Sequence, residues 1–257
     1  MAMLAFVATG FAQKKLVLYF SETQTTQKVA LALQEQLSLP DKAVVAIELV
    51  EPYTGNMMET MQRAQREKQP ALKPLKAKIA DYDIIFLGYP IWSGTYALPI
   101  ASLLKQEDFA GKTIVPFCTF GSGGLESSMA DLKKALPKAT IKPGYGVRQA
   151  RVASATKELD RFLKENGYVA GKVKALPAYS AQQPVTDAEK AIFDAACSSY
   201  QFPLVTPQTF GKRTTDDSID YEFKVKSQGF GGGGESTIYV TMGKEAGAKP
   251  EFTRVVR

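Results

Sequence analysis

The 257-residue chain contains no histidine and only two cysteines, Cys118 and Cys197. Without histidine, the Ser-His-Asp and Cys-His sets of nucleophilic catalysis are excluded, as is every zinc site that needs an imidazole. Two cysteines are too few for a Cys₄ metal site or a disulfide-stapled scaffold. We therefore expect no catalytic side-chain set of these kinds and no metal centre.

Basic residues moderately outnumber acidic ones, with 32 Lys and Arg against 26 Asp and Glu and a net charge of +6. Residues 13–167 hold most of the excess, with 21 basic and 16 acidic side chains and a net charge of +5. The chain has no outstanding run of Lys or Arg, so nucleic-acid binding receives little support. We expect a mildly basic, solvated surface.

Residues 3–12 form a short apolar segment, about half as long as a helix that spans a bilayer, so no membrane span is expected. Small residues precede a candidate cleavage site after Ala12, as in a secretory signal, although the basic region that usually begins such a signal is missing. We favour a periplasmic or exported protein in which residues 1–12 are a signal remnant. The alternative is an extra strand or helix packed on a cytoplasmic domain.

Short apolar runs alternate with helical patterns along the first two thirds of the chain. Such runs predict buried strands at residues 15–20, 44–49, 83–88 and 112–119, with a weaker one at 140–148. The helical patterns cover residues 26–39, 56–68, 74–80, 96–106, 125–136 and 154–166. This alternation predicts a parallel sheet of order 2-1-3-4-5 with helices on both faces, whose ligand lies beyond the carboxyl ends of the strands.

The composition changes after Gly167. Residues 168–186 are rich in Pro, Ala and Gln and are typical of a linker. A short helix is expected at residues 187–199, and apolar residues alternate with charged ones at 219–226, as in a half-buried strand. A glycine-rich hairpin turn at residues 229–234 and strands at 237–242 and 251–256 complete the pattern. Residues 187–257 are therefore expected to form a small α+β domain.

The turn after the first strand, residues 21–26, is rich in hydroxyl groups and enters a helix. Unpaired backbone N–H groups and the helix dipole favour a phosphate at such a position. The turn has no Lys or Arg, no Gly-Lys-Ser/Thr and no dinucleotide fingerprint, which argues against a nucleotide triphosphatase or a dinucleotide site. The alternative is a Ser/Thr-rich helix cap without a ligand.

Two further turns follow the third and fourth strands. Residues 88–96 include Trp92, the only tryptophan, which could stack on a planar ring or could simply cover the edge of the core. Residues 119–124 are rich in glycine, which allows backbone amides to approach a ligand closely. A cation-free phosphate site, an aromatic platform and backbone amides together fit flavin mononucleotide (FMN).

The same motifs resemble the flavodoxin family in its bacterial branch. They are Tyr-Phe-Ser-x-Thr-x-Thr-Thr at residues 19–26, Gly-x-Pro-Ile-Trp-x-Gly at 88–94, and Cys-Thr-x-Gly-Ser-Gly-Gly at 118–124. The resemblance covers about residues 14–166 and implies a five-stranded parallel flavodoxin-like three-layer sandwich that binds FMN. It assigns to the phosphate Ser21, Thr23, Thr25 and Thr26, and to the isoalloxazine ring Pro90, Ile91, Trp92, Gly94, Thr119, Gly121, Ser122, Gly123 and Gly124.

Three positions depart from the family pattern. Gln24 replaces a glycine in the phosphate loop, and glutamine adopts a positive φ less readily than glycine. Glu22 adds a negative charge beside a dianion, and Ser93 stands where the family usually has a second aromatic residue. We expect a reshaped loop or reduced phosphate affinity. We also expect Cys118, on a buried strand, to be an inert thiol rather than a redox group.

The leading hypothesis is an FMN-binding protein in electron transfer or flavin-dependent reduction, whose partner is a redox protein or a small-molecule electron acceptor. Familiar flavodoxin carriers are acidic, so the positive charge shifts weight towards a reductase or an unfamiliar partner. The alternative is a cofactor-free exported binding protein on a flavodoxin scaffold. Its C-terminal module, which loosely resembles cystatin-like domains at residues 187–257, would bind a protein or a glycan.

Overall fold

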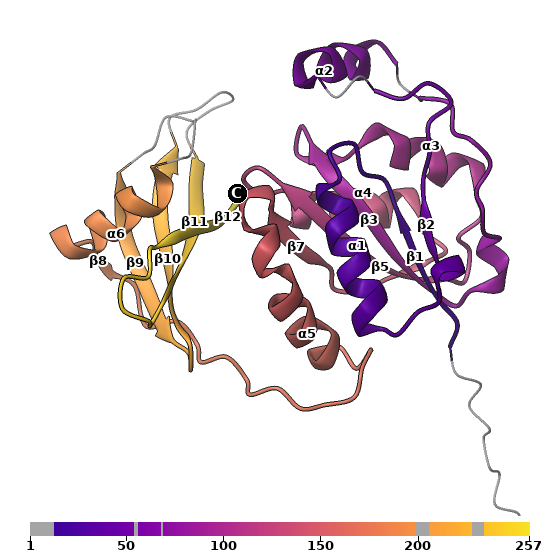
Figure 1. The fold of residues 1–257 in the computed structure, drawn as a ribbon. Helices are drawn as coiled ribbons and strands as arrows, with labels where there is room; N and C mark the ends of the chain where they lie inside the picture. The colour runs from indigo at the N-terminus through magenta and orange to yellow at the C-terminus, as the bar shows by residue number, and fades with distance from the viewer. Residues whose placement is uncertain (1–12, 54–55, 68, 199–205, 228–233) are drawn as a thin grey trace, which may run out of the picture.

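The computed structural model describes residues 13–53, 56–67, 69–198, 206–227 and 234–257. The expected signal remnant, residues 1–12, lies outside them, and export stays a prediction. Figure 1 shows an N-terminal α/β domain joined by a long segment to a C-terminal domain built on a second sheet. Among the described residues, no helix combines the length and apolar character needed to cross a bilayer.

A parallel sheet forms the middle layer of the N-terminal domain. Its strand order, β2-β1-β3-β5-β6, confirms the predicted order. The expected fifth strand is divided at Pro143, which lacks a backbone N–H, and both halves pair in parallel with β5. The strands are β1 (Lys15–Tyr19), β2 (Val44–Ala46), β3 (Ile84–Trp92), β5 (Thr113–Phe120), β6 (Thr140–Ile141) and β7 (Tyr145–Arg148).

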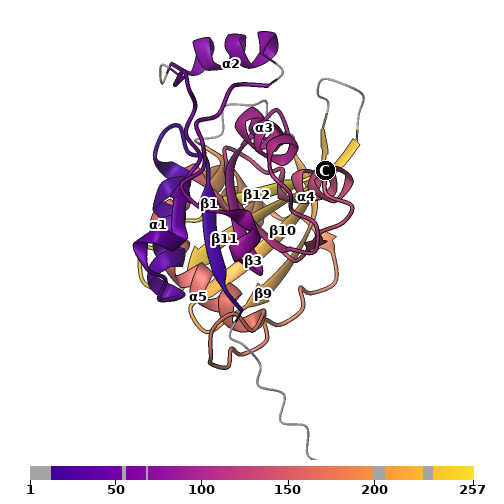
Figure 2. The same cartoon turned by 90° about the vertical axis from the view of Figure 1, so that its right-hand side faces the viewer.

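Two hydrophobic layers enclose this sheet because successive strand residues face opposite sides. Leu16 and Leu18 of β1 belong to one buried cluster, and Val17 belongs to the other. Helices α3 (Leu98–Gln106) and α4 (Leu125–Ala135) contribute to the first cluster, and α1 (Thr25–Gln36) and α5 (Ala155–Glu165) to the second. Figure 2 shows β1 and β3 between α1 on one side and α3 and α4 on the other.

Several elements differ in extent from the sequence expectation. The helix expected at residues 74–80 is only a 3₁₀ turn at Ile79–Asp81. Helix α3 begins at Leu98 because the two residues of β4 (Thr95–Tyr96) pair with β3 instead of entering the helix. Helix α2 (Met57–Arg66) is capped by the side chain of Asn56 and lies at the top of the domain in Figure 1. Two further 3₁₀ turns cover Asp41–Ala43 and Gln149–Ser154.

The C-terminal domain is an antiparallel sheet of order β12-β11-β10-β9-β8 with helix α6 (Asp187–Cys197) packed on it. Residues 229–233 of the expected glycine-rich turn lie outside the described residues, but Ser227 and Gly234 on either side of it are paired. The sheet begins inside the segment expected as a linker. Its strands are β8 (Gln183–Pro184), β9 (Pro207–Thr214), β10 (Ser218–Ser227), β11 (Gly234–Gly243) and β12 (Glu251–Val256).

Candidate functional site

The first loop of the candidate site connects β1 to α1 and contains the unusual Gln24. This residue adopts the left-handed conformation, with φ 61° and ψ 1°, and its side chain does not cap the helix. Its carbonyl accepts from the Lys28 N–H at 3.1 Å, so the helical hydrogen bonds begin there. The backbone N–H groups of residues 25–27 come before that first helical hydrogen bond, so the helix offers no carbonyl to accept from them. Gln24 thus adopts the backbone conformation that glycine would adopt in this loop, and its side chain makes that conformation strained.

The four hydroxyl groups of this loop have different surroundings. Thr23 and Thr25 share an exposed hydrogen bond of 3.0 Å. Thr26 is buried and its hydroxyl lies 2.9 Å from that of Thr119. The buried Ser21 Oγ has no hydrogen-bond partner among the described residues. A buried hydroxyl without a partner is costly, so Ser21 beside a helix N-terminus fits a phosphate oxygen.

Glu22 connects the first loop to α2. Its carboxylate accepts a hydrogen bond of 2.6 Å from Thr60 Oγ1, and Thr60 is 5% exposed. The carboxylate therefore has a structural partner on the helix that lies above the strand ends. The expected weakening of phosphate binding by Glu22 stays a prediction.

The second loop is a β-hairpin, which sequence reasoning did not foresee. Ile91 pairs with Tyr96, and Trp92 with Thr95. The two turn residues, Ser93 and Gly94, have φ of 50° and 86°, as a two-residue turn that matches the twist of its strands requires. The hairpin fixes the direction in which Trp92 leaves β3.

Trp92 belongs to an aromatic cluster at the ends of the strands. It packs edge-on against Phe20, with ring centres 5.8 Å apart, and against Tyr53, at 5.3 Å. The Arg63 guanidinium of α2 lies 4.8 Å from the centre of the Tyr53 ring. The half-buried Trp92 thus covers the edge of the core, while a planar ligand could still contact the cluster. Tyr53 was missed by sequence reasoning, although it follows the second strand at the same edge of the sheet.

The third loop connects β5 to α4 and touches both the second loop and the C-terminal domain. Gly124 caps α4 with φ 114°, and a Cβ there would lie 2.7 Å from Ile91 Cγ2. A Cβ on Gly123 would lie 2.3 Å from the carbonyl oxygen of Val255 in β12. The glycine at 123 therefore allows a strand of the C-terminal domain to approach the loop, a contact that local sequence patterns do not reveal.

Direct contacts bring the three loops together, as the sheet order requires. Phe20 N–H donates to Gly88 O at 2.9 Å, which links the first and second loops. Half-buried Pro90 pairs with Thr119 across β3 and β5. Together with the Thr26–Thr119 bond, these contacts place the three loops that carry the proposed residues at one edge of the sheet. The edge thus joins a helix N-terminus, an aromatic cluster and a glycine-rich loop.

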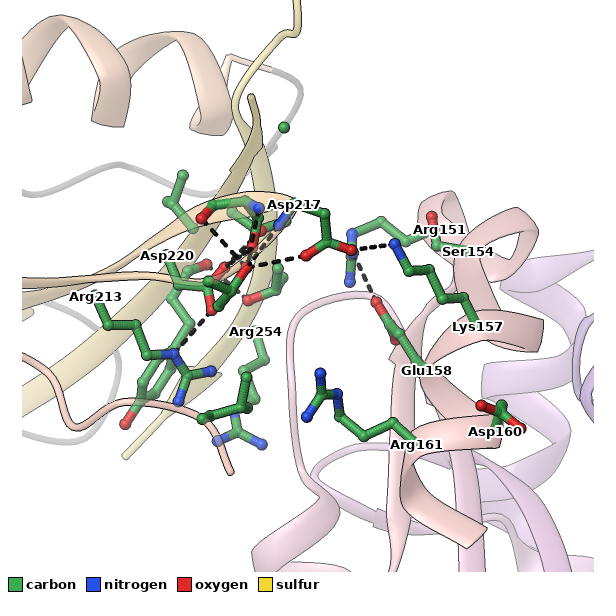
Figure 3. A pocket seen from close by; sticks show the side chains of 18 of the residues that line it. Arg151, Ser154, Lys157, Glu158, Asp160, Arg161, Arg213, Asp217, Asp220 and Arg254 are labelled. Atoms are coloured by element: carbon green, nitrogen blue, oxygen red, sulfur yellow. Dashed lines mark hydrogen bonds and ion pairs between the residues drawn. The ribbon is translucent and has the colours of Figure 1, made fainter. Parts of the chain in front are cut away.

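A separate cleft of about 1070 Å³ lies between α5 and the C-terminal sheet. Figure 3 shows its charged side chains facing one another, and they are paired: Arg151 with Glu158 at 2.7 Å, Arg213 with Asp220 at 2.8 Å, and Lys157 with Asp217. None of the site residues proposed from the sequence lines this cleft. Of the ion pairs at this cleft, Lys157–Asp217 and Arg151–Glu251, at 2.9 Å, join the two domains. These charges do not belong to the edge with the three loops.

The two thiols are buried in different cores and are not joined by a disulfide. Burial raises the pKa of Cys118 well above its usual range and that of Cys197 to about 12. Both therefore stay protonated at neutral pH, and a protonated thiol is a poor nucleophile.

A protein-family profile described as Flavodoxin matches residues 14–165. No curated protein matches the chain. Among solved structures, the chain is similar to a candidate flavoprotein from Bacteroides uniformis, with 27% identity over 58% of this chain and 99% of that one and a TM-score of 0.50. About two fifths of the present chain thus has no counterpart in that protein.

Two other solved structures are similar to the chain. A candidate flavoprotein from Bacteroides eggerthii is 28% identical over 57% of this chain and 98% of that one, with a TM-score of 0.46. A flavoprotein from Lactobacillus acidophilus, in complex with FMN, is 20% identical over 56% of this chain and 99% of that one, with a TM-score of 0.46.

Proposed function

Because the chain belongs to the flavodoxin family, we propose that it binds FMN at the edge formed by the three loops and acts in electron transfer or flavin-dependent reduction. The observation that carries this proposal is the buried Ser21 hydroxyl, which has no partner among the described residues, at the N-terminus of α1. A phosphate there would accept hydrogen bonds from Ser21 and from the first backbone amides of the helix.

The three loops would contact different parts of the cofactor. Ser21, Thr23 and Thr25 would hold the phosphate. The sequence assigns Thr26 to the phosphate as well, but because its hydroxyl is bonded to that of Thr119, we propose that it supports the loop. The residues that would line the ring are Pro90, Ile91, Trp92 and Gly94 of the second loop and Thr119, Gly121, Ser122, Gly123 and Gly124 of the third. Bound FMN supplies the redox chemistry, while the protein orients it and sets the polarity around it.

Titration with FMN and with riboflavin tests this proposal, because riboflavin lacks the phosphate. Flavin fluorescence should be quenched by the wild-type protein. Ser21→Ala should weaken FMN binding about tenfold, which corresponds to loss of one charge-assisted hydrogen bond, and should leave riboflavin binding unchanged. Ser154→Ala, outside the three loops, is the control. No quenching by the wild-type protein would reject flavin binding.

A turnover assay would distinguish an electron carrier from a reductase. The net charge of +5 on residues 13–167 favours an acidic partner protein or an anionic acceptor. Steady oxidation of NAD(P)H with a quinone acceptor by the FMN-loaded protein would identify a reductase, and its absence would favour a carrier.

The cofactor-free alternative depends on the C-terminal domain. Its cleft of about 1070 Å³ against α5 offers a concave surface that the three loops do not use. In this alternative the chain is exported, and the module, with its proposed cystatin-like fold, binds a protein or a glycan outside the cytoplasm. Wild-type protein that fails to bind either flavin would favour it.

A further inference from the structure

Strand β12 of the C-terminal domain makes backbone contacts with the third loop. The Val255 N–H donates to the carbonyl of Ser122 at 2.7 Å, and Val255 and Gly123 form a parallel bridge. β12 is the edge strand of its sheet, and an edge strand presents unpaired backbone groups to whatever lies beside it. The third loop is therefore held by backbone hydrogen bonding and not only by side chains.

Arg148 at the end of β7 reinforces this contact from the N-terminal domain. It is 9% exposed, and its Nε donates to the carbonyl of Gly121 at 2.7 Å. Its Nη1 donates to the carbonyl of Phe252 in β12 at 3.1 Å, and its guanidinium lies 4.3 Å from the centre of the Phe252 ring. One buried cation thus binds the loop and β12 at the same time.

The hydrogen bonds from Arg148 and Val255 fix the orientation of two peptide groups in the third loop. A trans peptide is planar, with its N–H opposite its carbonyl. The carbonyl of Gly121 points to Arg148 and that of Ser122 points to Val255, so the N–H groups of Ser122 and Gly123 are turned away from these partners. Two successive amide donors are thus oriented by contacts that the C-terminal domain shares.

We propose that the C-terminal domain is part of the flavin site, with β12 and Arg148 acting as positioning elements for the third loop. The inference rests on the proposed FMN binding. The amides of Ser122 and Gly123 donate to the acceptor atoms of the flavin ring, whose nitrogens and carbonyl oxygens gain electron density on reduction. The domain thereby favours binding of the ring and stabilises the reduced flavin relative to the oxidised flavin.

Two variants of the intact 257-residue chain test the contact between β12 and the third loop. Val255→Pro removes the N–H that donates to Ser122, at an edge-strand position where proline is tolerated. Gly123→Ala places a Cβ against the Val255 carbonyl, 2.3 Å away. The matched control is Gly234→Ala, outside the three loops, because a Cβ there has no atom within 4 Å among the neighbours that the structure describes.

FMN and riboflavin titrations and the midpoint potential of the bound flavin are measured for all four proteins. Val255→Pro and Gly123→Ala should weaken both flavins by the same factor, at least tenfold, and shift the potential to more negative values. Gly234→Ala should stay within twofold of wild type. Equal or tighter binding by both variants would overturn the inference and leave FMN binding intact, whereas failure of the wild type to bind either flavin would defeat both.

A measurement on the wild-type protein alone covers the case in which a variant does not fold. Amide hydrogen exchange followed by NMR should show that FMN protects the N–H groups of Ser122 and Gly123. Bound FMN without protection of these two amides would contradict the proposed contact.

Discussion

The hydroxyl of Thr26, in the first turn of α1, lies 2.9 Å from the hydroxyl of Thr119, near the end of β5. The two residues are 1% and 4% exposed, so water does not readily replace the bond. It joins the loop that would hold a phosphate to the strand that leads into the glycine-rich loop. This buried hydrogen bond therefore links the first loop to the third loop.

Thr26→Val should remove this coupling and leave the Thr119 hydroxyl buried without its partner. We expect the free energy of unfolding to fall by about 1–3 kcal/mol, the usual cost of an unpaired buried polar group. The double variant Thr26→Val/Thr119→Val should lose less than the sum of the single losses, because neither hydroxyl then remains alone. Urea unfolding of the apoprotein measures all three. Additive losses would show that the hydroxyls do not stabilise one another.

Gln24→Gly should relieve the left-handed backbone at φ 61°. Glycine adopts this conformation without strain but loses more entropy on folding, so we expect a gain in stability of about 0.5–1 kcal/mol. FMN affinity should change less than fivefold, because the loop already has the required conformation. Ser38→Gly, at φ 52° beyond the end of α1, is the control that should gain similar stability. A large gain in affinity for Gln24→Gly alone would show that the native loop is distorted.

The sheet order and the meeting of the three loops were predictable from sequence. Buried strands such as Ile84–Trp92 have continuous apolar runs, and the topology of alternating strands and helices brings their carboxyl ends to one edge. The hairpin at Ser93 and Gly94 was not predictable. Its turn needs a positive φ at both residues, and although glycine at 94 suggests this conformation, serine at 93 does not. Local sequence patterns therefore predict the sheet and its helices but not the hairpin of the second loop.

The contact between Val255 and Gly123 lay beyond sequence reasoning for another reason. The two residues are far apart in the chain, and the placement of one domain on another depends on the packing of whole surfaces. The same holds for Arg148, whose local sequence gives no sign that it binds the carbonyls of Gly121 and Phe252. Gly123, which the sequence assigns to the ring site, also allows the close approach of β12, and no local sequence pattern indicates this second constraint.

Alkaline pH should destabilise the protein. Burial raises the pKa of Tyr89, of Cys118 and, to about 12, of Cys197 in the folded state. The unfolded chain loses these protons first, from about pH 8.5 for cysteine and about pH 10 for tyrosine. The folded state then binds more protons, so the free energy of unfolding falls as pH rises. Guanidinium unfolding at pH 8, 9.5 and 10.5 measures the slope, and Cys197→Ala should make it shallower. A slope that is flat in the wild type would show that these groups ionise in the folded protein.

Trp92 should report flavin binding directly, because it is the only tryptophan in the chain and lies in the aromatic cluster at the proposed site. A flavin ring against this cluster should quench tryptophan emission with the same dissociation constant that flavin fluorescence gives. Trp92→Phe, which keeps an aromatic ring against Phe20 and Tyr53, should abolish the emission while weakening flavin binding less than tenfold. Trp92→Ala should weaken it further and lower stability by about 1–3 kcal/mol, because a half-buried aromatic side chain is lost. Tryptophan emission that is unchanged at saturating FMN would place the flavin away from the second loop.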